Sequence, residues 1–458
     1  MSSSGLAADP ESSSRGLRRL LWRWHFYAGL CCVPFILLLA TTGSLYLFKP
    51  QVEHWQDRAF DTRVLAGKPL GPEAEAGLAL ARHPDARLEA YELPHAPGAA
   101  GRVWLRDGDG ERRRVVVHPV SGATLDDSRE RDRLMRIVQD LHGELLLGDT
   151  GSLFVELAAC WGIVMVLTGL YLWWPRGVSG LGGVLYPRLR RGAAVFWRDL
   201  HAVTGISVAA FALFLLLTAL PWTGVWGKAF RQLREVTGTA AVRQDWSLSR
   251  AADHSEHAGH AGHDTASQNA GAEPGALRLD DVVGRATALH WPPPVLVSGK
   301  GSMWTVKSET QNRPQRESLV LDSRTGEVLL HERFRDKHVI DRIVGVGVAA
   351  HEGQLFGFGN QMLGLFTALG LVTVAVSGLI GWWRRRPARR LGAPPAAAHA
   401  RPGAAVTGAL IALALFLPLF GASVLLVAFL DRVLLRNAHA VRTWLGLSRH
   451  ASFPKEST

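Results

Sequence analysis

The sequence is poor in cysteine and lacks the common nucleotide-binding motifs. Its 458 residues include only three cysteines, Cys31, Cys32 and Cys160, and all three fall inside long apolar stretches. They supply no disulfide framework for the polar segments, and we interpret them as small buried apolar residues. No G-x-G-x-x-G follows a predicted strand, and no P-loop or H-E-x-x-H is present, so the chain shows no site for NAD(P)H or flavin. Any electrons that it handles must therefore come from quinol or from another protein.

Acidic and basic residues are absent from the middle of five long apolar blocks. Each block is near or above the roughly 20 residues that a helix needs to cross the hydrocarbon core of a bilayer. A metal transporter should place polar or charged side chains along its path through the membrane, so these blocks argue against one. We therefore predict a multi-pass membrane protein with spans at residues 25–48, 153–174, 203–226, 361–383 and 404–430.

Arginine is concentrated in the short connections 175–202 and 384–403. The positive-inside rule places both connections in the cytoplasm, and the first span is an uncleaved anchor because no small-residue cleavage site follows it. The net charge of +11 reflects juxtamembrane arginines that can contact anionic lipid, and it does not indicate nucleic-acid binding. The tail lies outside if the fifth block spans, although its five basic residues fit that side poorly. The other expected segments are a cytoplasmic N-terminus at 1–24, outer segments at 49–152 and 227–360, and a C-terminal tail at 431–458.

One segment of the chain occurs twice without a gap, from His142 to Trp174 and from His351 to Trp383. Both copies have a glycine six residues after the histidine, a Thr-Gly or Ser-Gly pair ending 27 residues after it, and a Trp-Trp pair at 31 and 32. A weaker, gapped match adds the other span of each half: a Trp-Arg pair precedes a histidine, and glycine follows four residues later and threonine 17 residues later. Such repeats mark duplicated structural units. The histidines of this second match are His25 and His201.

Each repeated unit contains two membrane crossings, so both copies have the same orientation in the bilayer. We therefore expect His25 and His201 together at the cytoplasmic face, and His142 and His351 together at the outer face. A single histidine at the end of a span is more often an interfacial residue than a ligand, but two equivalent pairs favour metal binding. Within a helical bundle, two imidazoles can occupy both axial positions of a haem iron, and such a haem carries electrons rather than oxygen.

Other residues near the histidines have both a functional and a structural explanation. The Thr-Gly and Ser-Gly pairs are equally explained by tight packing between helices, and a positive-inside role explains the arginines equally well. Four glycines would let a porphyrin approach the backbone closely: Gly29, Gly143, Gly205 and Gly353. Four arginines are candidates to hold its propionate groups: Arg23, Arg198, Arg136 and Arg342.

The two outer segments resemble each other in their strand and turn patterns. Residues 103–125 and 303–329 each read as a strand, a turn, an alternating strand, a second turn ending in glycine and a further strand. We expect a small α+β domain in each segment, with helices near 73–82 and 280–289. Helical spacing of apolar residues before His142 and His351 predicts that each histidine ends a short amphipathic helix at the outer interface.

The second outer segment contains an insert at 250–275 that has no counterpart in the first. Its small and polar residues cannot form a core, so we expect it to be disordered. Metal binding by this insert is a hypothesis only, because the spacing fixes no coordination geometry. Its histidines recur at every third position: His254, His257, His260 and His263.

The histidine motifs, W-R-x-H…G and H-x6-G…[TS]-G…W-W, together with the outer segments ending HPVSGATL and DSRTGEVL, resemble the PepSY-associated transmembrane-helix family. The resemblance covers roughly residues 18–386 and extends to the dihaem siderophore reductases of that family. It implies an α-helical membrane bundle of duplicated two-helix units, with two small α+β PepSY-like domains in the periplasm. It further implies two b-type haems, with His25 and His201 as one pair of axial ligands and His142 and His351 as the other. The His-rich insert and the fifth span are not parts of the pattern.

Our hypothesis is that the chain is a multi-pass protein of the bacterial inner membrane that reduces ferric siderophore, or another ferric chelate, to Fe(II) at the periplasmic face. The electron donor is a quinol or a cytoplasmic reductase. Electron transfer needs no acid or base, so we nominate no catalytic residue. The alternative is a haem-free membrane sensor or scaffold whose PepSY-like domains bind a peptide or a protein.

Overall fold

The computed structural model describes residues 10–61, 67–175, 180–239, 276–394, 403–433, 435 and 438–447. The predicted insert at 250–275, with its four histidines, lies outside these residues. Two compact units are present, which we call the helical unit and the sheet unit. The helical unit comprises Met1–Ser44, His142–Gln232 and Leu365–Thr458, and the sheet unit comprises Leu45–Leu141 and Leu233–Gly364.

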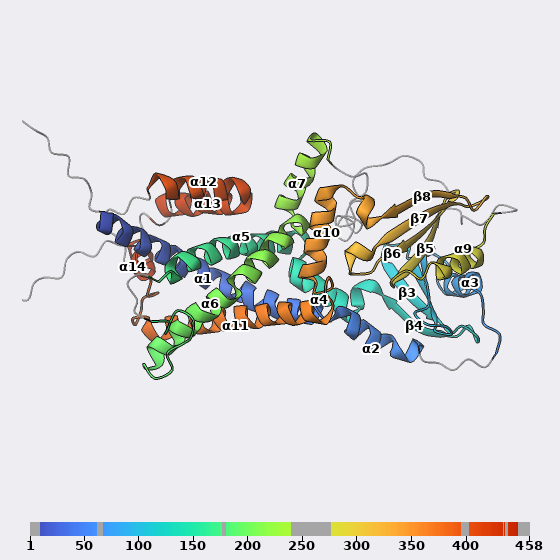
Figure 1. Cartoon of the computed structure of the whole chain (residues 1–458), viewed down its shortest axis with the longest axis horizontal. Coiled ribbons are helices and arrows are strands. Elements are labelled where there is room, and N and C mark those ends of the chain that lie inside the picture. The colour runs from blue at the N-terminus through green and yellow to red at the C-terminus, as the bar shows by residue number, and fades with distance from the viewer. Residues whose placement is uncertain are drawn as a thin grey trace, which may run out of the picture. The chain divides into compact units, whose positions relative to one another are not determined.

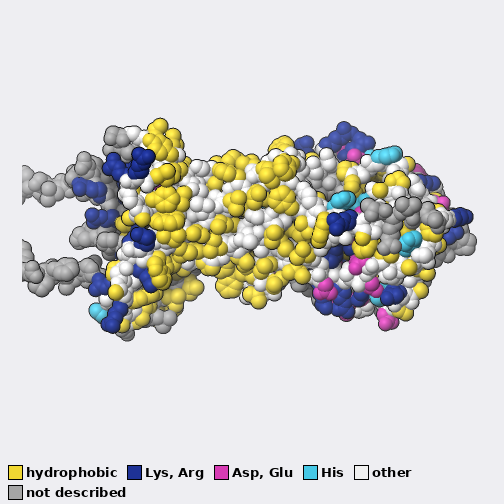
Figure 2. Space-filling view, turned by 90° about the horizontal axis from the view of Figure 1, so that it is seen from below, with side chains coloured by type: hydrophobic (Ala, Val, Ile, Leu, Met, Phe, Trp, Pro, Cys, Tyr) yellow, Lys and Arg dark blue, Asp and Glu magenta, His cyan; other side chains and the backbone are white. Residues whose placement is uncertain are grey.

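Among the residues that the structure describes, four helices are long and apolar enough to cross a membrane, and they correspond to the first four predicted spans (Figure 1). Glycine allows some of them to approach closely: a Cβ on Gly370 would lie 2.4 Å from Val208, and one on Gly162 would lie 3.3 Å from Leu216. Figure 2 shows hydrophobic side chains over this unit, with Lys and Arg gathered at the end where α1 begins. The four helices are α1 (Pro10–Tyr46), α5 (Gly148–Trp173), α6 (Ala193–Ala219) and α11 (Phe358–Arg385).

The predicted fifth span is not one straight helix. Residues 404–430 fall in two helices, α12 (Ala404–Phe416) and α13 (Pro418–Val433), which lie side by side and meet at an angle of 118° (Figure 1). The break follows from Pro418, which has no N–H to donate within a helix. Leu417 and Phe420 at the bend are fully buried against α5 in a cluster that includes Cys160.

The residues after α13 return to the end of the helical unit where α11 ends. Helix α14 (His439–Leu445) is followed by Gly446, and the Trp444 carbonyl accepts a hydrogen bond of 3.0 Å from the backbone N–H of Leu391. On α1, Tyr27 donates a hydrogen bond of 2.5 Å to the carbonyl of Leu445. The bent pair is therefore a hairpin whose two ends are both tied to this end of the unit.

The sheet unit contains one antiparallel sheet of eight strands in the order β4-β3-β2-β1-β5-β6-β7-β8. Strands β1–β4 come from the first outer segment and β5–β8 from the second, and they join where Tyr91 of β1 pairs with Val297 of β5. The two expected α+β segments thus share one sheet. The strands are β1 (Arg87–Glu92), β2 (Gly101–Arg106), β3 (Arg112–Val117), β4 (Thr124–Arg129), β5 (Val295–Lys300), β6 (Met303–Ser308), β7 (Glu317–Asp322) and β8 (Val328–Arg333).

Corresponding turns connect the last two strands of each half, as their sequences predict. Between β7 and β8, Asp322 Oδ1 accepts hydrogen bonds from the backbone N–H groups of Arg324 and Thr325, at 2.9 and 2.7 Å. Gly326 follows with φ of 70°, a conformation that glycine adopts without a steric cost. Between β3 and β4, His118 Nδ1 accepts from two backbone N–H groups in the same way, and Gly122 has φ of 71°.

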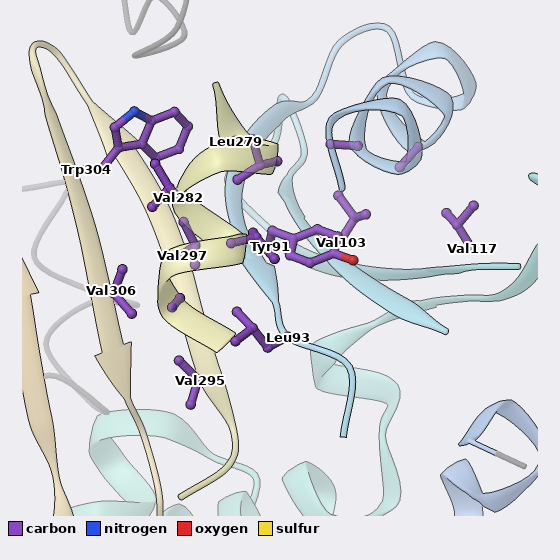
Figure 3. Close-up of a cluster of buried hydrophobic side chains, with 14 of the residues drawn as sticks. Tyr91, Leu93, Val103, Val117, Leu279, Val282, Val295, Val297, Trp304 and Val306 are labelled. Atoms are coloured by element: carbon purple, nitrogen blue, oxygen red, sulfur yellow. The ribbon is translucent and has the colours of Figure 1, made fainter. Parts of the chain in front are cut away.

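One face of the sheet packs against α3 (Pro72–Arg82) and α9 (Leu279–Ala288), which form where the sequence predicts helices. Figure 3 shows Leu279 and Val282 of α9 among the valines of β2, β5 and β6. The opposite face carries buried arginines that pair with α2 (Lys49–Asp61). Arg114 makes a two-point contact with Asp57 at 2.7 and 3.1 Å.

A buried carboxyl group lies within the apolar core of the sheet unit. Glu75 of α3 is 3% exposed and accepts a hydrogen bond of 2.8 Å from the hydroxyl of Tyr91. Burial, assisted by the charge of Asp280, raises the pKa of Glu75 to about 7, although the Tyr91 hydrogen bond opposes this rise. Gly101 is required beside this pair, because a Cβ there would lie 1.9 Å from Glu75 Oε2.

Short helices complete the described chain. Arg234 of α7 and Asp341 of α10 form a buried two-point ion pair, with N···O distances of 2.5 and 2.9 Å. The short α-helices are α4 (Leu134–Glu144), α7 (Val225–Val236) and α10 (Val339–His351). The 3-10 helices are η1 (Glu130–Asp132), η2 (Leu220–Trp222), η4 (Arg313–Gln315) and η5 (Phe334–Asp336).

Candidate functional site: a histidine pair in the helical unit

The helical unit contains three of the four histidines of the repeat. His25 lies in α1, His201 in α6 and His142 in α4, whereas His351 is the last residue of α10 in the sheet unit. The structure brings His25 and His201 together, with ring centroids 6.3 Å apart and ring planes nearly perpendicular at 89°. The pairing of His142 with His351 stays a prediction.

Each ring of the His25–His201 pair contacts the second span of its own half of the chain. His25 Nδ1 is 3.0 Å from the hydroxyl oxygen of Thr168 on α5. His201 Nδ1 is 2.9 Å from the backbone carbonyl oxygen of Val374 on α11. The carbonyl of Met165, one turn before Thr168, also lies within reach of the His25 ring. Each imidazole is therefore held through Nδ1 by a group outside the pair.

His142 has the same kind of contact. Its Nδ1 is 2.9 Å from the hydroxyl oxygen of Thr42, which is buried on α1. In the sequence, Thr42 is distinguished only by its position 17 residues after His25. A polar group on a long apolar helix thus contacts each of the three histidines in the helical unit.

Three glycines lie directly against these imidazoles, and they are not the ones expected from the sequence. A Cβ on Gly169 would lie 3.2 Å from Cε1 of His25, one on Gly378 would lie 3.2 Å from Cε1 of His201, and one on Gly43 would lie 3.1 Å from Cε1 of His142. By contrast, a Cβ on Gly29 or on Gly205 would meet only Met165 or Val374, at 3.6 and 3.9 Å. The glycines that approach the histidines belong to other helices than the histidines themselves.

The separation of His25 and His201 fits two imidazoles on opposite sides of one metal ion. A metal–imidazole bond is about 2 Å long, and the ligating nitrogen lies about 1 Å from the ring centre. Two such ligands in line place their ring centres roughly 6 Å apart, which agrees with the 6.3 Å observed. Within the part of the chain that the structure describes, no group of three or more His, Cys, Asp or Glu side chains is placed to hold a metal ion. A two-histidine haem site needs no third protein ligand.

Three of the four arginines proposed for propionate groups make side-chain contacts within the protein. Arg23 donates 2.6 and 3.3 Å hydrogen bonds to the carbonyls of Pro394 and Gly446. Arg198 contacts Asp199 at 2.7 Å, and Arg136 contacts Asp140 at 3.0 Å.

A different arginine lies over aromatic rings close to the histidine pair. The guanidinium of Arg385 lies 5.5 Å from the ring centre of Trp22 and 5.8 Å from that of Phe26, the residue after His25. The sequence presented Arg385 only as one member of a basic run, so its place near the pair could not be read from it.

Comparison with protein families covers most of the chain. Residues 22–385 match the model of the family described as PepSY-associated TM region. The chain belongs to this family. The match contains all four histidines of the repeat and the sheet strands, and it ends where α11 ends, so the family model does not include the α12–α13 hairpin. No curated protein matches the sequence.

Proposed function

We propose that this PepSY-associated membrane protein is a dihaem oxidoreductase that reduces ferric siderophore, or another ferric chelate, at the periplasmic face of the bacterial inner membrane. The observation that supports it most directly is the 6.3 Å separation of the His25 and His201 rings, each anchored through Nδ1 to a neighbouring span. A b-type haem held by two histidines has no open iron position, and it supplies one-electron transfer rather than oxygen chemistry.

His25 and His201 are the proposed ligands of one haem, and His142 and His351 those of the second. The second assignment rests on the repeat, in which His142 and His351 occupy equivalent positions before equivalent spans. The contact of His142 with Thr42 and Gly43 agrees with it, because it reproduces the contact of His25 with Thr168 and Gly169.

The proposed reaction takes one electron from a quinol or a cytoplasmic reductase and delivers it to ferric iron. Fe(II) is a poorer match than Fe(III) for the hard oxygen ligands of a chelate, so reduction itself promotes release of the iron. Delivery of the electron from a haem to ferric iron involves no proton transfer, and accordingly no acid or base is assigned to that step. A quinol donor would give up two electrons and two protons, so it would reduce two ferric ions in turn and release its protons to water. In this proposal the sheet unit binds the ferric chelate.

The proposed orientation has the N-terminus and the arginine-rich connections in the cytoplasm. The α12–α13 hairpin adds an even number of crossings or none, because α14 is tied to the residues that follow α11. The C-terminal tail then belongs on the cytoplasmic side together with its basic residues. This differs from the outer location expected for a single straight fifth span, and it removes the conflict with the positive-inside rule.

An absorption spectrum of the full-length protein, purified after expression with an adequate haem supply, tests the proposal. We expect a Soret band, and we expect each of His25→Ala, His201→Ala, His142→Ala and His351→Ala to remove about half of it, since each variant loses one ligand of one haem. The control His83→Ala, which removes a histidine paired with Asp127 in the sheet unit, should keep the full signal.

A wild-type protein without a Soret band would refute the dihaem proposal and favour the haem-free peptide- or protein-binding sensor. A Soret band that every single histidine variant retains in full would refute the ligand assignment. If the haems are present, the ferric-chelate reductase activity of the wild-type protein and its loss in the same variants test the proposed substrate class.

A further inference from the structure

The glycine of a Thr-Gly or Ser-Gly pair lies against each of the three histidines in the helical unit. Thr42 and Gly43 contact His142, and Thr168 and Gly169 contact His25. Gly378, which follows Ser377, lies against His201. These are three separate contacts, each between two different helices. The sequence explains Thr-Gly and Ser-Gly pairs as helix-packing residues, but packing alone does not require an imidazole in the same place each time.

Each threonine hydroxyl has a backbone carbonyl to donate to, which leaves its oxygen to accept from the histidine. A hydroxyl has one proton, and Thr168 donates it to the carbonyl of Val164, four residues earlier, at 2.8 Å. Thr42 does the same with the carbonyl of Leu38, also at 2.8 Å. The oxygen of each threonine is then the acceptor in its contact with the imidazole, so the proton between them belongs to Nδ1.

His201 also has its proton on Nδ1, and in this case the acceptor is a backbone carbonyl. Ser377 donates its hydroxyl proton to the carbonyl of Thr373 at 2.6 Å, and the partner of His201 is the carbonyl of Val374. A carbonyl oxygen has no proton to give, so His201 carries the proton on Nδ1 as well. In a neutral imidazole with a proton on Nδ1, the lone pair is on Nε2, and this is the form that ligates a metal.

The glycines limit the tilt of each imidazole ring, which the hydrogen bonds alone do not fix. A hydrogen bond through Nδ1 sets the position of one ring edge, and the glycine surface, with its missing Cβ only 3.1 to 3.2 Å from Cε1, limits how the ring can tilt. His25 and His201 are constrained in this way by different helices, and their planes are held 89° apart.

We propose that Thr42 with Gly43, Thr168 with Gly169, and the Val374 carbonyl with Gly378 are positioning elements. The hydrogen-bond acceptor, in the last turn before each glycine, fixes the tautomer of the imidazole, and the glycine fixes its rotation. This inference rests on the proposed haem function. In metal sites, residues that hydrogen-bond to the metal ligands orient those ligands and raise their basicity. We assign the same role to these residues.

Alanine at the contacting glycines is the first test. Gly169→Ala and Gly378→Ala place a methyl group against the His25 and His201 rings, which must turn to make room. Because the anisotropy of the low-spin ferric EPR signal depends on the angle between axial imidazole planes, we expect both variants to keep haem but to shift the largest g value of one haem. The matched control Gly381→Ala, also on α11, meets nothing within 4 Å and should leave the spectrum unchanged.

Threonine variants provide a second test that introduces no added bulk. Thr42→Val and Thr168→Val remove the acceptor hydroxyl but keep the shape of the side chain. We expect the reduction potential of one haem to rise, because the imidazole becomes a weaker donor to ferric iron, and haem retention to weaken roughly 10- to 100-fold. The effect should be smaller for Thr168→Val, because the Met165 carbonyl stays within reach of His25. Thr42→Ser and Thr168→Ser restore the hydroxyl and should restore the wild-type potential.

The outcomes separate this inference from the proposed function. If the wild-type protein binds no haem, the proposed function fails. If it binds two haems but the EPR signals of Gly169→Ala and Gly378→Ala and the potentials of both valine variants equal those of the wild type, the positioning role is wrong while the haem assignment stands. A change that appears equally in Gly381→Ala would also overturn the positioning role, because it would reflect a general disturbance of α11.

Discussion

Replacing Glu75 with glutamine should stabilise the sheet unit above neutral pH. Glu75 is 3% exposed, lies in the apolar core and receives a hydrogen bond from Tyr91. Burial raises the pKa of its carboxyl group from the ordinary value of 4.5 to about 7, and the nearby charge of Asp280 contributes to this rise. Glutamine has nearly the same shape and is neutral at every pH, so it reproduces the protonated form.

The size of the effect follows from the pKa values of the folded and unfolded states. The folded state binds this proton more tightly than the unfolded chain does, because the pKa is raised on folding. The stability that results is complete below pH 4.5 and is lost as the pH rises through about 7. At about 1.4 kcal/mol per pKa unit, the loss approaches about 3 to 4 kcal/mol above pH 8.

Calorimetric unfolding of the full-length protein in detergent, at pH values from 5 to 8, measures this effect. The Glu75→Gln variant should match the wild type in stability at pH 5 and exceed it increasingly up to pH 8. The control Glu73→Gln lies on the same helix, but its carboxylate is 45% exposed and pairs with Arg278 at the surface, so it should change stability by less than about 1 kcal/mol. A Glu75→Gln variant that is less stable than the wild type at pH 8, or that differs from it equally at pH 5 and pH 8, would refute this reasoning.

Two further predictions concern the packing of the sheet unit. Gly101→Ala should destabilise it by about 3 kcal/mol or more, because the new Cβ would lie 1.9 Å from Glu75 Oε2, whereas Gly77→Ala on α3 meets nothing within 4 Å and should be neutral or stabilising by up to about 1 kcal/mol. Asp341→Ala should cost about 3–5 kcal/mol, because it leaves the charge of Arg234 buried without its carboxylate. Thermal unfolding of the full-length variants measures both effects.

A surface ion pair provides the control for Asp341→Ala. Arg131, which is 54% exposed and pairs with Glu111, should be replaceable by alanine at a cost below about 1 kcal/mol. Equal losses in the two variants would contradict the distinction between buried and exposed pairs. A Gly101→Ala variant as stable as the wild type would show that Glu75 and Tyr91 can move apart without cost.

The long spans could be predicted because apolar length alone marks a membrane helix, but their ends could not. Helix α6 begins at Ala193, ten residues before the predicted span at 203. These additional turns are helical but not apolar. They contain Arg198 and Asp199, which form an ion pair. The bend at Leu417 was missed for the opposite reason: the run is apolar on both sides of Pro418, and only the proline indicated a break.

In the sheet unit, local sequence patterns predict the strands and turns but not the pairing between the two halves. The strands and turns of each half were predictable because each depends on residues that are close in the chain, such as Asp322 and Gly326. The pairing of β1 with β5 joins residues about two hundred positions apart, and no local pattern encodes it. The two halves were therefore predicted as separate domains, although they form one sheet.

The histidines were found through the repeat, whereas the residues that contact them were present in the same repeat but assigned to packing. Gly169 is the second residue of a Thr-Gly pair, and Gly378 is the second residue of a Ser-Gly pair. Their contact with His25 and His201 depends on how α1 meets α5 and how α6 meets α11, which spacing within one helix does not reveal. The repeat itself could have indicated this contact. A Thr-Gly or Ser-Gly pair occurs at the same distance from a histidine in both halves, which suggests that the two pairs have the same role.

The junction between β1 and β5 also constrains how the protein is made. Synthesis proceeds at about 5–20 residues per second, so the roughly two hundred residues between Tyr91 and Val297 take on the order of ten to forty seconds to emerge. During this time the strands of the first half expose the β1 edge that β5 will cover, and two further membrane helices must be inserted before the partner strand arrives. An open strand edge is a template for aggregation. The nascent protein therefore has an interval during biogenesis in which this edge is exposed, and a chaperone that shields strand edges would improve its yield.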